Sequence, residues 1–213
     1  WVRMKTAVTL DGRTAFPDGR SQWITGEAAR ADVQFWRGRA GAVLTGIGTV
    51  LADDPQMNVR LPDQERQPLR IVIDPRMETP PAGKLLTSKG GKVFIAAAAE
   101  YPTRRAALEA AGAEVWVLPD AAVPGRVDLR ELMRELAKRE VNEVHVEAGP
   151  RLSGALFAAG LIDEMLFYYA PCLFGAGMGP AAVPLPAEPG AAYRWRLQSL
   201  DQIGGDFRVL LRR

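Results

Sequence analysis

The segment from residue 141 to residue 160, VNEVHVEAGPRLSGALFAAG, constrains the fold most strongly. Val144 and Val146 are apolar and β-branched, as a buried strand prefers. The sequence Ala148-Gly149-Pro150 then breaks the strand, and apolar residues recur at helical spacing until Gly160, which is typical of a helix end. The segment therefore predicts a strand, a tight turn and a helix, which is the repeating unit of a parallel α/β sheet.

The predicted turn is also a candidate anion-binding position. The first N–H groups of a helix have no partner inside the helix, and together with the helix dipole they favour a phosphate or pyrophosphate. Glu147 ends the predicted strand, and ligands of open α/β sheets bind at such carboxyl ends. An ordinary turn that binds nothing remains the alternative, because one glycine falls short of a complete G-x-G-x-x-G.

The rest of the chain continues the alternation of strands and helices. Asp128 is a good helix N-cap, and the helix that follows places Leu129, Leu132, Met133 and Leu136 inward. The apolar segment 165–170 could lie at a sheet edge, and the last segments alternate around Gly204-Gly205, as in an antiparallel pair. We therefore predict one domain, 1–213, of α/β class, with a mostly parallel central sheet and an antiparallel C-terminal hairpin. Strands are expected at 2–8, 42–45, 70–73, 92–97, 114–118, 144–147, 164–170, 195–200 and 207–211. Helices are expected at 25–38, 102–111, 128–139 and 151–159, and a short helix is expected after the turn at 46–48 that ends before Pro55.

Composition narrows the class of function. The net charge of +2 is too small to indicate a nucleic-acid surface, and no apolar run is long enough to cross a bilayer. Cys172 and His145 are the only residues of their kinds, so we expect no disulfide and no metal site. Without a metal cluster or a nucleophile pair, hydride transfer is favoured over hydrolysis, because the cofactor supplies the reactive atom. The Gly-rich turns at 46–48 and 148–150 could hold the two phosphates of one dinucleotide.

Several blocks of sequence resemble a known family. The blocks are MKTAVTLDGRTA, GRSQWIT, RADVQFWRGRAGAVLTGIGTVLADDPQMNVR, PLRIVIDPR and HVEAGPRLSGALFAAGLIDEMLFYYAP, and they follow one another over nearly the whole chain. In combination they resemble the reductase domain of the bifunctional riboflavin-biosynthesis deaminase–reductase. The resemblance implies a dihydrofolate-reductase-like three-layer fold. It also implies that NADPH reduces 5-amino-6-(5-phosphoribosylamino)uracil to its ribitylamino counterpart.

The resemblance also implies roles for individual residues. Arg37 and Arg60 would clamp the ribose 5-phosphate, because guanidinium groups match phosphate geometry. Arg76 is a candidate for binding the adenosine 2′-phosphate of the cofactor. The family often has Ser where this chain has Pro75, and this difference leaves the preference for NADPH over NADH open. The other substrate-contacting positions are Ser21, Met57 and Glu147, and the other cofactor-contacting positions are Ala7, Trp23, Thr49, Asp53, Gly149, Pro150, Arg151, Leu152, Ser153, Gly154 and Ala155.

Reduction at C1′ requires the ribose ring to open to an imine, and ring opening requires proton transfer. Lys5 and Glu147 are the candidate catalytic residues, with Asp53 a weaker third, and the alternative for the first two is an ion pair that only stabilises the sheet. For Lys5, the catalytic role and the purely structural ion pair stay equally open.

Three further expectations concern the protein as a whole. The chain has no H-x-E together with P-C-x-x-C, so zinc-dependent deamination is excluded for it and the deaminase half is expected to be absent. We expect a cytoplasmic homodimer without nucleic-acid or membrane partners. The alternatives for its activity are an archaeal-type reductase that acts before deamination, a dihydrofolate reductase, and a non-catalytic nucleotide-binding protein of the same fold.

Overall fold

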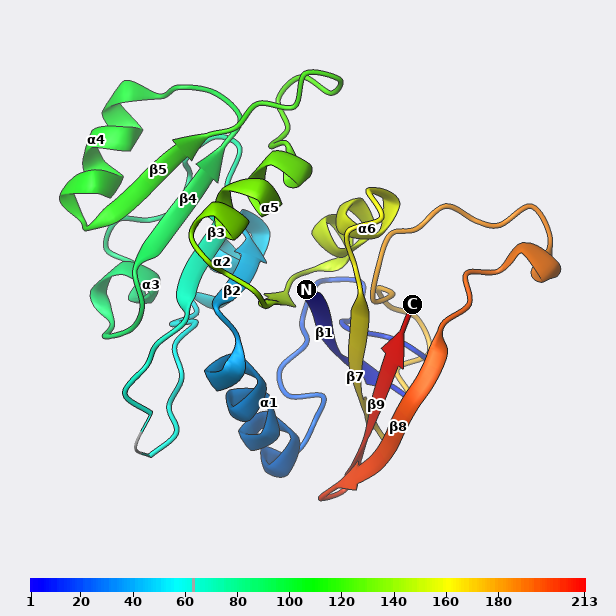
Figure 1. The fold of residues 1–213 in the computed structure, drawn as a ribbon. Coiled ribbons are helices and arrows are strands. Elements are labelled where there is room, and N and C mark those ends of the chain that lie inside the picture. Colours follow the sequence, from blue (N-terminus) through cyan, green and yellow to red (C-terminus); the bar gives the residue numbers. More distant parts are fainter. Residues whose placement is uncertain (63) are drawn as a thin grey trace. The chain divides into compact units, whose positions relative to one another are not determined.

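The computed structural model describes residues 1–62 and 64–213 (Figure 1). The chain divides into two compact units, which we treat separately. The first unit comprises Trp1–Val33 and Val146–Arg213, and the second comprises Gln34–His145. Two elements contribute residues to both units: helix α1 (Glu27–Arg39) and strand β6 (Val144–Glu147). The prediction of a single domain therefore stays a prediction.

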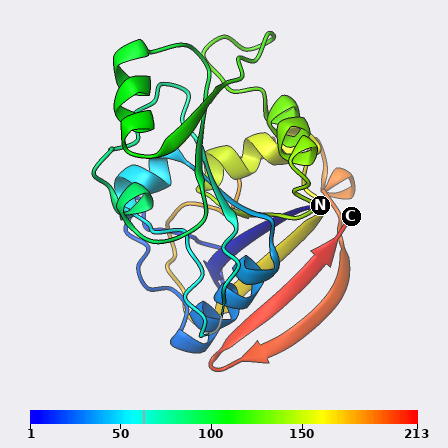
Figure 2. The ribbon, with the colours of Figure 1, turned by 60° about the vertical axis from the view of Figure 1, so that its left-hand side comes forward.

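The first unit is built on four adjacent strands in the order β1-β7-β9-β8 (Figure 2). Strands β1 and β7 are parallel, whereas β9 pairs antiparallel with both β7 and β8. The last two strands form the predicted C-terminal hairpin, which turns at Gly204 with a φ of 62°. Strand β7 has a partner on each side, so the expectation that 165–170 forms a sheet edge is wrong. The elements are β1 (Val2–Thr9), α6 (Pro150–Ala158), β7 (Glu164–Ala170), the 3-10 turn η1 (Pro189–Ala191), β8 (Arg196–Ile203) and β9 (Asp206–Arg212).

The second unit contains four parallel strands in the order β5-β4-β3-β2. Strands β2, β3 and β4 are short and almost fully buried, as strands covered on both faces require, whereas the edge strand β5 is partly exposed. The core cluster of this unit includes Val43, Val72 and Ile95, together with Leu108 of the covering helix. The elements are β2 (Ala42–Gly46), α2 (Ile47–Asp53), β3 (Leu69–Ile73), α3 (Lys84–Thr87), β4 (Val93–Ala97), α4 (Pro102–Ala110), β5 (Ala113–Val117) and α5 (Leu129–Lys138).

The α/β class, the mostly parallel strands and the antiparallel hairpin are confirmed. Asp128 caps α5 as predicted, because its carboxylate accepts hydrogen bonds from the N–H groups of Arg130 and Glu131. Leu132 and Leu136 are buried, whereas Leu129 and Met133 are only half-buried. Helix α3 was not expected, because its four residues are too few to show a periodic pattern.

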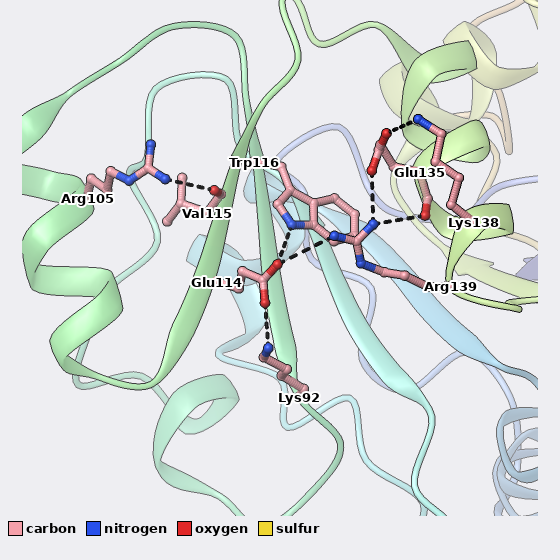
Figure 3. Close-up of polar contacts among 8 residues, drawn as sticks. All are labelled: Lys92, Arg105, Glu114, Val115, Trp116, Glu135, Lys138 and Arg139. Carbon is pink, nitrogen blue, oxygen red and sulfur yellow. Dashed lines mark hydrogen bonds and ion pairs between the residues drawn. The ribbon is translucent and has the colours of Figure 1, made fainter.

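A charged cluster covers the edge strand β5 of the second unit (Figure 3). Glu114 accepts hydrogen bonds from Lys92 and, at 2.8 Å, from the indole N–H of Trp116. The guanidinium of Arg139 lies 4.3 Å from the centre of the Trp116 ring and pairs with Glu135 at 2.9 Å. Charged side chains on an edge strand discourage pairing with another chain. No helix within the described residues has the length and apolar character needed to cross a membrane.

Candidate functional site

The first turn of α6 has the features predicted for an anion site. Gly149 caps the helix with extended backbone and no side-chain hydrogen bond, and Pro150 occupies the first turn, where its missing N–H costs nothing. A Cβ atom added at Gly149 would meet nothing within 4 Å, so the backbone is open to an approaching group. The unpaired N–H groups that begin a helix favour a phosphate. The cofactor phosphates predicted to bind here stay a prediction.

The interior side of the same helix has a different role. Ser153 and Gly154 are buried, and the Ser153 hydroxyl donates to the carbonyl of Ala148 at 3.3 Å. A Cβ atom at Gly154 would lie 2.2 Å from the carbonyl oxygen of Ala182, whose N–H donates to the carbonyl of Pro150 at 2.9 Å. Because Gly154 has no side chain, the backbone of Ala182, in the segment after β7, can pack closely against helix α6. Among the predicted cofactor residues of this helix, Gly149 and Arg151 are exposed, whereas Pro150, Leu152 and Ala155 are half-buried.

Strand β1 places Lys5 and Ala7 on one half-buried face. The Lys5 ammonium lies 5.9 Å from the centre of the Tyr168 ring, and Ala7 stands opposite Tyr168 in the register with β7. Burial, together with the hydrogen bond donated to Asp32 and the negative charges of Asp32 and Glu147, raises the pKa of Tyr168. The structure therefore brings Lys5, one of the two predicted catalytic residues, near Tyr168. Sequence reasoning did not single out Tyr168 or Asp32, because the tyrosine lies in an apolar strand and its partner is distant in sequence.

The loop before α1 carries Ser21 and Trp23. Ser21 is half-buried, whereas the Trp23 side chain is 71% exposed, which excludes a role in the core. The guanidinium of Arg30 lies 4.8 Å from the centre of the Trp23 ring and donates to the carbonyl of Thr25 at 2.6 Å. An exposed indole held by a cation offers a flat surface to a ligand, as the predicted cofactor contact requires.

In the second unit the two arginines predicted to bind phosphate converge on one residue. Arg37 donates to the backbone carbonyl of Asn58 at 3.1 Å, and Arg60 donates to its side-chain oxygen at 2.9 Å. The Asn58 amide donates to the carbonyl of Lys89 at 2.8 Å, and Gln34 accepts from the N–H of Arg60 at 3.0 Å. Asn58 thus anchors both guanidinium groups, a role that the sequence did not reveal.

The remaining predicted residues of the second unit have different exposures. Thr49 is half-buried within α2, and Asp53 is exposed at its end. Met57 is only 3% exposed and packs in the core cluster, so its side chain faces the interior of the unit. Arg76 is exposed after β3 and pairs with Glu78 at 3.2 Å. The roles of these residues toward substrate and cofactor stay predictions.

Comparisons with known proteins point to one family. A riboflavin biosynthesis protein RibD from Haemophilus influenzae is 36% identical over 98% of this chain. The solved structure of Acinetobacter baumannii RibD, form 1, is 36% identical over the whole chain with a TM-score of 0.87. A Thermotoga maritima structure named diaminohydroxyphosphoribosylaminopyrimidine deaminase/5-amino-6-(5-phosphoribosylamino)uracil reductase covers the whole chain at 26% identity with a TM-score of 0.81. These likenesses confirm the predicted dihydrofolate-reductase-like fold.

The matches cover part of each relative. The chain spans 57% of the Haemophilus protein, 57% of the Acinetobacter chain and 56% of the Thermotoga chain. Residues 1–209 match the family described as the RibD C-terminal domain. The resemblance noted from the sequence is therefore confirmed, and the chain belongs to the RibD C-terminal domain family of riboflavin biosynthesis.

Proposed function

We propose that the chain is the NADPH-dependent reductase that converts 5-amino-6-(5-phosphoribosylamino)uracil to 5-amino-6-(5-phosphoribitylamino)uracil. The observation that carries this proposal is the convergence of Arg37 and Arg60 on Asn58. Two guanidinium groups anchored on one residue suit a phosphate monoester, because each presents several N–H donors in a fixed plane. Folate carries no phosphate, so this arrangement favours a sugar-phosphate substrate over folate.

The cofactor phosphates would bind at the open first turn of α6, around Gly149 and Arg151. The bound nicotinamide supplies the hydride, while the protein orients the ring and the substrate. Trp23 would form one wall of the cofactor position, with Ala7, Thr49 and Asp53 as further contacts. Arg76 is exposed and would contact the 2′-phosphate that distinguishes NADPH from NADH.

Lys5 and Glu147 would carry the proton transfers that open the ribose ring. Opening forms a carbon–nitrogen double bond at C1′, while the ring oxygen takes up a proton and leaves as the C4′ hydroxyl. A lysine ammonium can donate that proton, and a carboxylate can hold the sugar hydroxyl groups or accept a proton in return. The Lys5 ammonium lies 5.9 Å from the centre of the Tyr168 ring, and the charge of Glu147 contributes to the raised pKa of Tyr168, which supports a shared role in this step.

We also infer a homodimer in the cytoplasm. The exposed apolar residues Leu197 and Leu200 lie on strand β8, which pairs only with β9 among the described residues. A monomer in light scattering at working concentration would refute the dimer.

The direct test is oxidation of NADPH with the enzymatically deaminated phosphoribosylaminouracil as substrate. We expect Arg60→Ala to raise KM by about tenfold or more, because phosphate contacts contribute mainly to binding. Glu147→Gln should lower kcat by about a hundredfold. The matched control is Arg134→Ala, which removes an exposed arginine that pairs with Glu131 on α5.

The same assay separates the alternatives. Turnover only with the undeaminated substrate would favour the archaeal-type reaction. NADPH binding without turnover of either substrate would favour a non-catalytic protein. Equal rates with NADH and NADPH would remove the proposed role of Arg76.

A further inference from the structure

A polar row crosses the sheet of the first unit. The strand registers place Tyr168 opposite Ala7 on one side and opposite Arg208 on the other, and Arg208 opposite Asp201. Residues directly opposite one another in a sheet project from the same face. Lys5 is two residues before Ala7 on β1, so it projects from that face as well. Lys5 and the row therefore share one face of four strands.

The ring of Tyr168 is fixed within this row. Its side chain is fully buried, and its hydroxyl donates to Asp32 of α1 at 2.6 Å. Arg208 pairs with the same Asp32 carboxylate at 2.9 Å and with Asp201 at 2.9 Å. The hydroxyl is thus a donor to an ion-paired carboxylate. The raised pKa of Tyr168 keeps the phenol protonated, and its proton is engaged in the hydrogen bond to Asp32.

The fixed ring lies beside Lys5, one of the two candidate catalytic residues. The ammonium of Lys5 lies 5.9 Å from the ring centre, within the range at which an aromatic face attracts a cation. Glu147 lies close enough for its charge to contribute to the raised pKa of Tyr168. A rigid aromatic face at this distance limits where the flexible lysine chain can place its ammonium. Such limits matter because small misplacements of a reacting group slow a reaction strongly.

We propose that Tyr168 is a positioning residue whose buried ring holds the Lys5 ammonium in place for proton transfer. This inference rests on the proposed function, which assigns the proton transfer to Lys5. It differs from a purely structural role because it requires the aromatic ring itself. It does not require the hydroxyl to contact the substrate.

Ring-retaining and ring-removing variants test the proposal. Tyr168→Phe keeps the ring, whereas Tyr168→Leu and Tyr168→Met remove it, and the unbranched methionine serves if the leucine variant fails to fold. Tyr169→Leu is the matched control, because consecutive strand residues face opposite sides. For each variant we would measure kcat, KM, NADPH affinity and the melting temperature.

We expect the ring-less variants to lose about tenfold or more in kcat, with KM and NADPH affinity nearly unchanged. Tyr168→Phe should retain most of the wild-type kcat, and Tyr169→Leu should match the wild type. Wild-type kcat in a folded ring-less variant would overturn the proposal. An equal loss in Tyr168→Phe, or in Tyr169→Leu, would also overturn it, because the ring would then not be the determining element.

A second readout does not depend on turnover. The rate at which an amine-reactive acylating reagent modifies Lys5 can be followed by peptide mass spectrometry in the wild type and in Tyr168→Met. We expect the rate to rise by about threefold or more without the ring, because the ring stabilises the unreactive ammonium form. An unchanged rate would overturn the contact with Lys5. A raised rate in a protein without reductase activity would leave the contact standing and refute only the proposed function.

Discussion

Gly154 provides a sharp test of how the segment after β7 packs on helix α6. The Cβ atom of an alanine here would lie 2.2 Å from the Ala182 carbonyl oxygen, whereas ordinary contact begins at 3.4 Å. The obstructing atoms belong to the backbone, so no side-chain rotation can relieve the clash. Gly154→Ala must therefore displace the backbone around Ala182, or the helix, by about 1 Å.

The expected free-energy change combines opposing effects. Overpacking costs about 1–3 kcal/mol. Displacement also weakens the hydrogen bond from Ala182 to Pro150, which contributes about 1 kcal/mol. Alanine regains about 1 kcal/mol of helix propensity over glycine. We therefore expect Gly154→Ala to lower the free energy of unfolding by about 1–3 kcal/mol.

Gly48→Ala is the matched control for this measurement. Gly48 also lies in a helix, α2, but an added Cβ would meet nothing within 4 Å. We expect this variant to be more stable than the wild type by up to about 1 kcal/mol. Urea unfolding followed by circular dichroism measures both changes, and limited proteolysis reports whether the segment around Ala182 is released. A Gly154→Ala protein as stable as Gly48→Ala would refute the close packing.

Two further predictions concern charged groups. Glu164 is fully buried between Arg3 and Arg212. We expect Glu164→Ala to lower the free energy of unfolding by about 3–5 kcal/mol, because the buried Arg3 loses this carboxylate. Urea unfolding measures the change, and a loss below about 1 kcal/mol would contradict the prediction. Hydrogen bonds from Lys92 and Trp116 lower the pKa of Glu114 from 4.5, so the carboxylate stabilises the fold above that pH and the effect is lost as the pH falls below it. Glu114→Gln should therefore cost less than about 1 kcal/mol at neutral pH and nothing in strong acid, and an equal cost at both pH values in thermal unfolding would refute the ion-pair explanation.

The sequence predicted most elements of the fold because their patterns are local. The cap at Asp128 depends on residues two and three positions away, so its chemistry is visible in the sequence. The edge position expected for 165–170 was wrong because strand pairing depends on partners elsewhere in the chain. Strand β9 follows β7 only after a long segment, and periodicity cannot show that it adds to that side of the sheet.

The candidate site was predicted less completely for the same reason. Arg37 and Arg60 were identified through the resemblance, but Asn58, which binds Arg37 through its backbone carbonyl and Arg60 through its side chain, carries no motif of its own. Gly154 was grouped with the cofactor contacts because it belongs to the segment 149–155, which the resemblance assigns to the cofactor phosphates. Its close contact with Ala182 shows a packing requirement that only the folded backbone reveals.

The ion pairs of the first unit also narrow the choice of proton-transfer group. Glu164 is held by Arg3 and Arg212, and Asp32 is held by Arg208 while accepting from Tyr168. Each of these carboxylates is one partner of an arginine ion pair in a partly or fully buried position, and removing one partner of such a pair is destabilising. Glu147 is half-buried at the end of β6, where ligands of such sheets bind. Glu147 therefore stays the carboxylate predicted to exchange a proton with the substrate, because Glu164 and Asp32 are held in ion pairs with arginines.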